Sequence, residues 1–170
     1  MKIVHYLSDF SLRSETFVYD LVLGLANTFQ STVVTHRRTL ELERPYQNVI
    51  VVPQHVPIMK RALLRLFAKF RIRDEAAVLD VLEREQPSVL HAHFGPNGLQ
   101  MYELIRRHQV NVPLIVSFHG MDINVLPHAS RRYRRKLLRL NSDPRTYFTS
   151  PSRFLKQKMT RLGLDNAKIR

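Results

Sequence analysis

Short apolar runs alternate with longer stretches of helical pattern along most of this 170-residue chain. Strands that alternate with helices predict a parallel sheet that is covered by helices on both faces. We therefore expect an α/β fold, a single Rossmann-like, doubly wound parallel sheet in one domain over residues 1–170. The expected strands lie at residues 2–7, 32–35, 49–52 and 145–149, with two more within the segments 87–98 and 112–122. The expected helices lie at 14–27, 59–73, 74–85, 99–108, 131–140 and 152–162.

Two of the expected strands end in histidine with a glycine close behind. Val89-Leu90-His91-Ala92-His93 is followed by Phe94-Gly95-Pro96-Asn97-Gly98, and Leu114-Ile115-Val116-Ser117-Phe118 is followed by His119-Gly120-Met121-Asp122. In an open α/β sheet, ligands bind beyond the carboxyl ends of the parallel strands. These two strand ends therefore predict a binding edge.

His119 and Asp122 are the candidate catalytic residues at this edge. The reference pKa of histidine, about 6.5, allows His119 to act as a base or as a charged hydrogen-bond donor after a modest shift. Asp122 would orient the histidine ring or bind a pair of hydroxyl groups. The alternative is structural: His119 closes the strand, and Asp122 caps the segment that follows. Spacing alone leaves both interpretations open.

Two helix starts are candidate substrate-binding segments. Gly95 and Asn97 precede an expected helix, whose unpaired N–H groups could bind an anion or sugar hydroxyls, although a plain turn would use the same residues. Ser14, Glu15 and Thr16 open the first helix, where a helix cap explains them as well as a ligand does. His93 and Gly120 complete the candidate set.

A metal site is the alternative use of the histidines. His91 and His93 point to the same face of a strand, and His119 could be a third ligand. No carboxylate falls at ligand spacing beside them, and a hydrogen-bonded strand end explains the pattern, so we expect no metal. The chain also lacks cysteine and the glycine-rich phosphate-binding fingerprints, so no bound cofactor is predicted for this domain.

The formal net charge of +13 is concentrated in two segments without acidic residues. Residues 59–73 and residues 131–139 each carry six Lys or Arg, which leaves 15 basic against 14 acidic residues elsewhere. Such patches favour polyanionic partners. In the first segment a stripe of cations at every fourth position, Arg61, Arg65, Lys69 and Arg73, lies opposite an apolar side. With Lys60 it predicts contact with an anionic membrane surface, and an ordinary surface helix packed on its own sheet is the alternative.

Two features predict the cellular location. Residues 1–9 form a short apolar run that His5 interrupts, so they read as a strand and not as a signal peptide. No stretch approaches the ~20 apolar residues of a membrane span. We expect a cytoplasmic protein, peripheral on the inner face of the cytoplasmic membrane.

A non-catalytic basic module that binds nucleic acid or a partner chain is the alternative function. Tyr133 is the single aromatic residue among the arginines of residues 131–139, which makes a poor stacking platform for bases.

Several separated motifs occur in the order of one known family. Ser14-Glu15-Thr16-Phe17, His91-Ala92-His93-Phe94-Gly95, Phe118-His119-Gly120-Met121-Asp122 and Ser152-Arg153-Phe154-Leu155 follow one another, then Leu162-Gly163 and Lys168-Ile169. Over essentially its whole length the chain resembles the amino-terminal, acceptor-binding domain of a family 4 retaining glycosyltransferase with the GT-B fold. It is similar in particular to bacterial enzymes of capsule, exopolysaccharide and colanic acid assembly.

The resemblance implies a function that this chain would share with a second domain. His119 matches the histidine against the donor sugar, Asp122 matches the acid after the His-Gly pair, and Ser14-Glu15-Thr16 match a loop–helix junction that faces the interdomain cleft. The complete enzyme would transfer a hexose from a nucleotide-sugar co-substrate to a saccharide or lipid-linked acceptor, without a metal. The family's carboxyl-terminal donor domain is not found in this sequence, so the resemblance implies a fragment, a truncated gene product, or one half of a split enzyme with a separate donor chain.

Overall fold

The structure, a computed structural model, describes residues 1–52 and 75–170. The predicted basic helix at residues 59–73, with the cations that we assign to membrane contact, lies outside the described residues. The chain divides into two compact units, residues 1–90 and 91–170. Each unit is described by itself below.

The strands follow the hydrogen-bonded order β3-β2-β1-β4-β5-β6. The β1–β2, β2–β3 and β5–β6 ladders are parallel. A helix lies in the crossover from β1 to β2 and in that from β5 to β6, whereas β2 and β3 are joined by a loop. The predicted α/β, Rossmann-like fold with one parallel sheet is confirmed.

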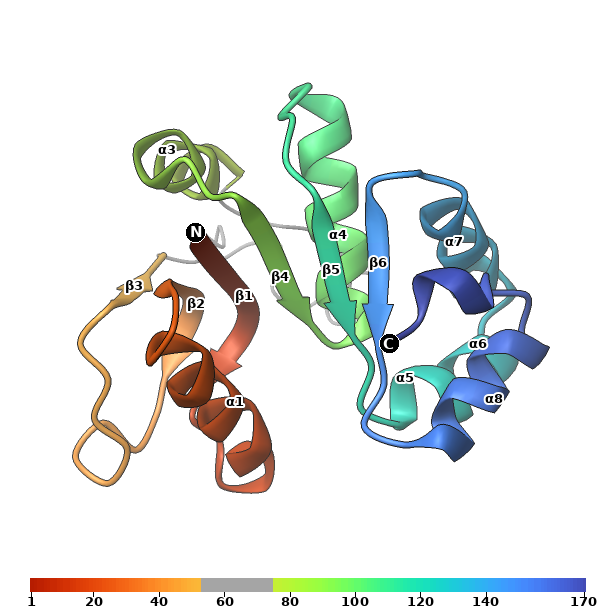
Figure 1. Cartoon of the computed structure of the whole chain (residues 1–170), viewed down its shortest axis with the longest axis horizontal. Coiled ribbons are helices and arrows are strands. Elements are labelled where there is room, and N and C mark those ends of the chain that lie inside the picture. Colours follow the sequence, from red (N-terminus) through yellow and green to blue (C-terminus); the bar gives the residue numbers. More distant parts are fainter. Residues whose placement is uncertain (53–74) are drawn as a thin grey trace, which may run out of the picture. The chain divides into compact units, whose positions relative to one another are not determined.

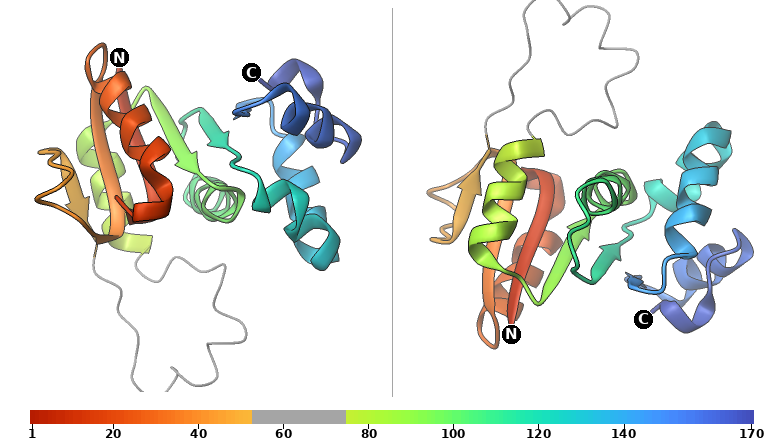
Figure 2. Two further views of the ribbon diagram at one scale, coloured as in Figure 1. Left: turned by 90° about the horizontal axis from the view of Figure 1, so that it is seen from below. Right: turned by 90° about the horizontal axis from the view of Figure 1, so that it is seen from above.

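The first unit is built on β1 (Lys2–Phe10), β2 (Gln30–Arg38) and β3 (Val49–Val51). Lys2 lies opposite Gln30 in the β1–β2 ladder, and Val33 lies opposite Val49 in the β2–β3 ladder. The helices α1 (Thr16–Ala26) and α3 (Glu75–Glu85) flank this ladder on opposite faces (Figure 2). The buried side chains of the unit include Tyr6, Phe10, Val18, Val22, Val34, Val78 and Leu82.

The first helix starts differently from the prediction. A 3₁₀ turn, Arg13–Glu15, precedes α1, and the Glu15 N–H donates to the Leu12 carbonyl at 3.0 Å. Ser14 therefore lies inside this turn, and the N-cap of α1 is Glu15, whose side chain makes no capping bond. The prediction that Ser14 caps the helix is wrong, because the 3₁₀ turn satisfies the first backbone groups instead.

The second unit contains the end of β4 (Val89–His93), followed by α4 (Gly95–Arg107), β5 (Leu114–Ser117), α7 (Arg131–Asn141), β6 (Thr146–Thr149) and α8 (Arg153–Arg161). Helix α4 packs against both β5 and α7 (Figure 1). The core of the unit is formed by Leu104, Leu114, Val116, Phe118, Tyr133, Leu137, Leu140, Phe148 and Met159.

Capping residues set the bounds of the last helices. Ser130 and Ser152 accept hydrogen bonds from the backbone N–H groups of Tyr133 and Leu155, so both serines are N-caps. Gly163, at φ +101°, ends the helix α8 in the left-handed region, as predicted. Ile169 then bridges Phe148 in parallel, so the last residues begin to add to the edge of β6.

The structure differs from the predicted helices at two places. Helix α4 begins at Gly95, four residues before the predicted start, because Pro96 occupies its first turn, where proline is tolerated. The segment after β5 also forms two short helices that we did not predict, α5 (Met121–Asn124) and α6 (Leu126–Ala129). None of the described helices combines the length and the apolar character that a bilayer span requires.

The contact between α4 and β5 depends on the absence of a side chain at Gly98. A Cβ added there would lie 2.5 and 2.7 Å from the two methyl groups of Val116, which are close to the strand and cannot move away. We predict that Gly98→Ala lowers the free energy of unfolding by about 1–3 kcal/mol in urea denaturation. Gly24→Ala is the control, because a Cβ there meets nothing within 4 Å and should stabilise α1 by about 0.5–1 kcal/mol. Equal effects of the two variants would contradict the tight packing at Gly98.

Candidate functional site

The candidate site lies in the second unit, where β4 and β5 end and α4 and α5 begin. The Phe94 N–H donates to the Ser117 carbonyl at 2.8 Å, so the two strand ends are held side by side. Phe94 itself has φ +70°, a conformation that is costly for a residue with a side chain. This turn takes the chain directly from β4 into α4.

The Asp122 carboxylate joins the two strand-to-helix turns. Its Oδ2 accepts the N–H of Gly95 at 3.0 Å, and its Oδ1 accepts the N–H groups of Gly120 at 2.9 Å and His119 at 3.1 Å. The side chain is buried, with 3% of its surface exposed. One carboxylate therefore binds the first N–H of α4 and both N–H groups of the His119–Gly120 turn. We call this arrangement the Asp122 clamp.

Burial and hydrogen bonding act on Asp122 in opposite directions. Burial raises the pKa of its carboxyl group above the usual value, and the backbone N–H bonds oppose that rise. The Tyr133 hydroxyl packs close by, because a Cβ added to Gly95 would lie 2.0 Å from it. Burial, together with the charge of Asp122, raises the pKa of Tyr133, so this hydroxyl stays protonated. The helix α7 thereby covers the clamp with an aromatic ring.

His119 is the partly exposed member of a row of rings. Its imidazole lies 6.0 Å from that of His93 in a stacked arrangement and 4.6 Å from the ring of Phe94, between centroids. Burial lowers the pKa of His119 to about 4, so the ring is neutral near pH 7. A neutral imidazole can donate one hydrogen bond and accept another, which suits a hydroxyl group of a ligand.

A buried chain of hydrogen bonds runs beneath these rings. The His91 Nε2 atom lies 2.7 Å from the Ser117 hydroxyl, which lies 2.5 Å from the Thr149 hydroxyl, so the contacts cross from β4 to β5 and β6. Burial, and then the proximity of His119, lower the pKa of His91 to about 4. Ser117 also occupies one of the two ring nitrogens with which His91 could bind a metal.

The structure brings the predicted residues of this unit together, but buries most of them. His93 has no exposed surface and Asp122 almost none, so neither side chain reaches solvent in this structure. Asn97 is also buried and donates from its side-chain amide to the His93 carbonyl at 2.8 Å. His119 and Gly120 reach the surface. Whether any of these residues contacts a substrate stays a prediction.

The helix start at Gly95 differs from the predicted ligand site. We expected unpaired N–H groups there, but the Gly95 N–H donates to Asp122, so this group is not available to a ligand. The absence of a side chain at Gly95 is required by packing, since an added Cβ would also lie 2.9 Å from the ring of Phe118. The strand-end glycine thus serves the internal structure of the site.

Ser14, Glu15 and Thr16 belong to the first unit. Ser14 and Thr16 are exposed and Glu15 is half-buried at the start of α1. Burial, and then the charge of Asp9, raise the pKa of Glu15. Their contribution to a site shared with the second unit stays a prediction.

Three residues of the site were missed in the sequence. Ser117 and Thr149 carry the hydrogen-bond chain from His91, and Tyr133 covers the Asp122 clamp. Ser117 and Thr149 each end a strand, which is a signal that could have been used. Tyr133 lies among arginines in an expected surface helix, and only the helical spacing with Leu137 and Leu140 indicates that it faces inward.

The Asp122 clamp predicts a large effect from an isosteric change. Asp122→Asn keeps the shape but replaces one acceptor oxygen by a donor, so at least one buried N–H group loses its partner. We expect a loss of about 1–3 kcal/mol of unfolding free energy in urea denaturation. Asp165→Asn is the control, because the Asp165 carboxylate accepts an N–H bond from Ala167 at an exposed position. A loss at Asp122 no larger than at Asp165 would show that the clamp does not stabilise the site.

The depressed pKa of His91 predicts that the protein loses stability in acid. The folded state holds this ring neutral down to about pH 4, whereas the unfolded chain protonates it near pH 6.5, so the stabilisation is complete above pH 6.5 and falls as the pH drops towards 4. Between pH 7.5 and 5.0 we expect His91 to account for about 1–2 kcal/mol of lost stability. In His91→Gln, whose amide can still bond Ser117, the loss between these pH values should be smaller by about that amount. If the urea midpoint fell by the same amount between pH 7.5 and pH 5.0 in His91→Gln and in the unchanged chain, this would contradict a buried, neutral His91.

Comparison with solved structures finds several chains that share this fold. The chain is similar to HepE from Anabaena, solved in complex with UDP-glucose, with a TM-score of 0.72 and 14% identity. It is also similar to the lipopolysaccharide outer core galactosyltransferase WaaB, with a TM-score of 0.63 and 12% identity, and to sucrose-phosphate synthase from Thermosynechococcus elongatus, with a TM-score of 0.64 and 13% identity. All three comparisons cover 100% of this chain and 43%, 44% and 47%, respectively, of the other chains.

These likenesses show the fold, that of the amino-terminal domain of GT-B glycosyltransferases, and the chain spans less than half the length of these proteins. A sequence search of curated proteins found no match. The sequence model of Glycosyltransferase Family 4 matches residues 14–170, which include most of the first unit, all of the second unit and every residue of the candidate site. The chain therefore belongs to glycosyltransferase family 4.

Proposed function

We propose that this chain is the acceptor-binding half of a glycosyltransferase that transfers a hexose from a nucleotide-sugar to a saccharide or lipid-linked acceptor. The family membership and the GT-B fold support sugar transfer. Nucleotide-sugar binding is then the task of a donor domain, either in the same polypeptide or in a separate chain. Synthesis of a cell-surface polysaccharide such as a capsule or exopolysaccharide, by a retaining mechanism at the cytoplasmic face of a bacterial membrane, is part of this proposal.

The observation that carries the proposal is the environment of His119. This half-buried, neutral imidazole stands at the carboxyl end of β5, where ligands of parallel sheets bind. The Phe94 ring packs against it, and the Asp122 clamp fixes its backbone. A neutral ring held in this way can form a hydrogen bond to a sugar hydroxyl. Because the ring carries no charge, it does not need the water shell that an imidazolium would keep.

The two residues that we predict to be catalytic have different surroundings, and we propose different roles for them. His119 reaches the surface and can contact the reacting sugar. Asp122 is buried with both oxygens bound to backbone N–H groups, so in this proposal it is a positioning residue that acts through His119. The exposed side chain of Met121 lies between them in sequence and borders the same turn.

The test uses the chain joined to, or mixed with, a donor-binding domain that restores transfer. We predict that His119→Ala lowers turnover by about 100-fold, the scale of a lost hydrogen bond in the transition state, with less than a threefold change in acceptor affinity. His128→Ala, an exposed histidine on α6, is the matched control and should retain full turnover. Turnover by His119→Ala equal to that of the unchanged chain would remove His119 from the chemistry.

A further inference from the structure

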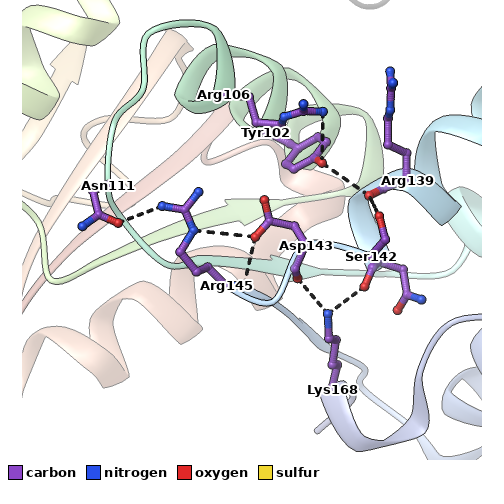
Figure 3. Close-up of polar contacts among 9 residues, drawn as sticks. Tyr102, Arg106, Asn111, Arg139, Ser142, Asp143, Arg145 and Lys168 are labelled. Atoms are coloured by element: carbon purple, nitrogen blue, oxygen red, sulfur yellow. Dashed lines mark hydrogen bonds and ion pairs between the residues drawn. The ribbon is translucent and has the colours of Figure 1, made fainter.

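A small cavity of about 220 Å³ lies between α4 and α7 in the second unit. Cationic side chains from both helices converge on it. Its lining consists of Leu99, Tyr102, Glu103, Arg106, Arg107, Lys136 and Arg139. Figure 3 shows part of this region, with Tyr102, Arg106 and Arg139 close together.

The lining carries a surplus of positive charge. Three guanidinium groups and one ammonium group face a single carboxylate, which gives a formal charge of +3. That carboxylate, Glu103, forms an ion pair with Lys136, and both side chains are partly exposed. Since Glu103 pairs with Lys136, it supplies no counter-charge to Arg106 or Arg139.

Arg139 is the arginine most available to a ligand. Within residues 1–52 and 75–170, no hydrogen bond or ion pair engages its guanidinium group, and in Figure 3 the side chain extends away from the contacts that its backbone makes. The acid of the neighbouring loop, Asp143, is engaged instead by Arg145, whose Nε lies 3.7 Å from its Oδ1. The loop therefore supplies no counter-charge to Arg139.

Tyr102 holds the second arginine in place. The guanidinium of Arg106 lies 5.5 Å from the centroid of the Tyr102 ring, and its Nη1 approaches the phenolic oxygen at 3.5 Å. The same hydroxyl donates to the Arg139 carbonyl at 3.4 Å. A buried tyrosine thus links the end of α4 to α7, and fixes the spacing between Arg106 and the backbone of Arg139.

We propose that this cavity is a binding site for a phosphate group, in particular a phosphate monoester. A monoester carries about −1.5 to −2 charges at pH 7 and three terminal oxygens, so it can accept hydrogen bonds from several cations at once. A carboxylate has only two oxygens and one charge, and would leave part of the lining without a partner. The volume is below the 300–1,000 Å³ of sites for drug-sized ligands, which suits a single phosphate head group.

The cavity is separate from the candidate site at the strand ends. Arg106 follows Gly95 by eleven residues along α4, which corresponds to about 16 Å at 1.5 Å per residue. The phosphate site would therefore lie towards the opposite end of α4 from His119. It goes beyond the proposed sugar transfer and does not depend on it.

Charge and position together define the variants that test the site. Arg139→Met removes the guanidinium that no described residue engages, and Arg135→Met removes the same charge from the exposed side of α7, outside the lining. Glu103→Gln removes the competing negative charge and frees Lys136. Arg106→Met provides a second loss from the other helix. All of these residues are exposed or half-buried, and circular dichroism checks that each variant folds.

The experiment is calorimetric titration of the 170-residue chain with glycerol 3-phosphate at low salt. We expect Arg139→Met and Arg106→Met to weaken binding about tenfold or more, Arg135→Met to change it less than threefold, and Glu103→Gln to tighten it. Equal weakening by Arg139→Met and Arg135→Met would show diffuse attraction to a basic surface and overturn the site. Absence of binding at about 10 mM ligand would overturn it as well.

A vesicle arm identifies the source of the phosphate. Phosphatidic acid in phosphatidylcholine vesicles presents the same monoester on a bilayer, and the chain is sedimented with them. Sedimentation that Arg139→Met abolishes and Arg135→Met retains assigns the site to a lipid head group. Binding of the soluble ester without sedimentation assigns it to a free phosphate ester. Sedimentation that both variants reduce equally counts against the cavity.

Discussion

The Asp122 clamp is the interaction on which the arrangement of the second unit depends. A parallel sheet offers no short hairpin to fix where one strand end lies relative to the next, so each strand-to-helix turn needs its own restraint. One buried carboxylate supplies this restraint for two turns, because its oxygens accept N–H groups from Gly95 and from the His119–Gly120 segment. Burial of its charge is costly, which its raised pKa shows. The same geometry places the imidazole of His119 against Phe94.

Much of the fold could be predicted from residue patterns because the relevant signals are local. The runs at β4 and β5 are apolar and end at histidine or serine, and Ser152 with Gly163 marks both ends of α8. The errors arise where tertiary packing decides. Helix α4 begins at Gly95, since Asp122, 27 residues further on, accepts its first N–H group. Ser14 is expected to cap the first helix, but it lies in a 3₁₀ turn in which the Glu15 N–H donates to the Leu12 carbonyl.

The chemistry of the candidate site could be predicted better than its exposure. Histidines at strand ends indicated which residues lie together, but alternation along a strand cannot show which ring is covered. His93 and His119 are both expected at the edge, yet one is fully buried and the other reaches the surface. Tertiary packing decides exposure here, as it does at Gly95, which lies against the Tyr133 hydroxyl and the Phe118 ring. No spacing rule along the chain contains that information.

The charges of the second unit indicate why a phosphate site between α4 and α7 is physically reasonable. Residues 91–170 carry 15 Lys and Arg but only four Asp and Glu. Each acid has an internal partner: Asp122 binds three N–H groups, Glu103 pairs with Lys136, Asp143 with Arg145, and Asp165 caps a turn. No carboxylate of residues 91–170 remains for Arg106 or Arg139, so these two cations repel one another unless an anion from outside collects there. The cavity where they meet around Tyr102 is the place where one bound phosphate relieves that repulsion.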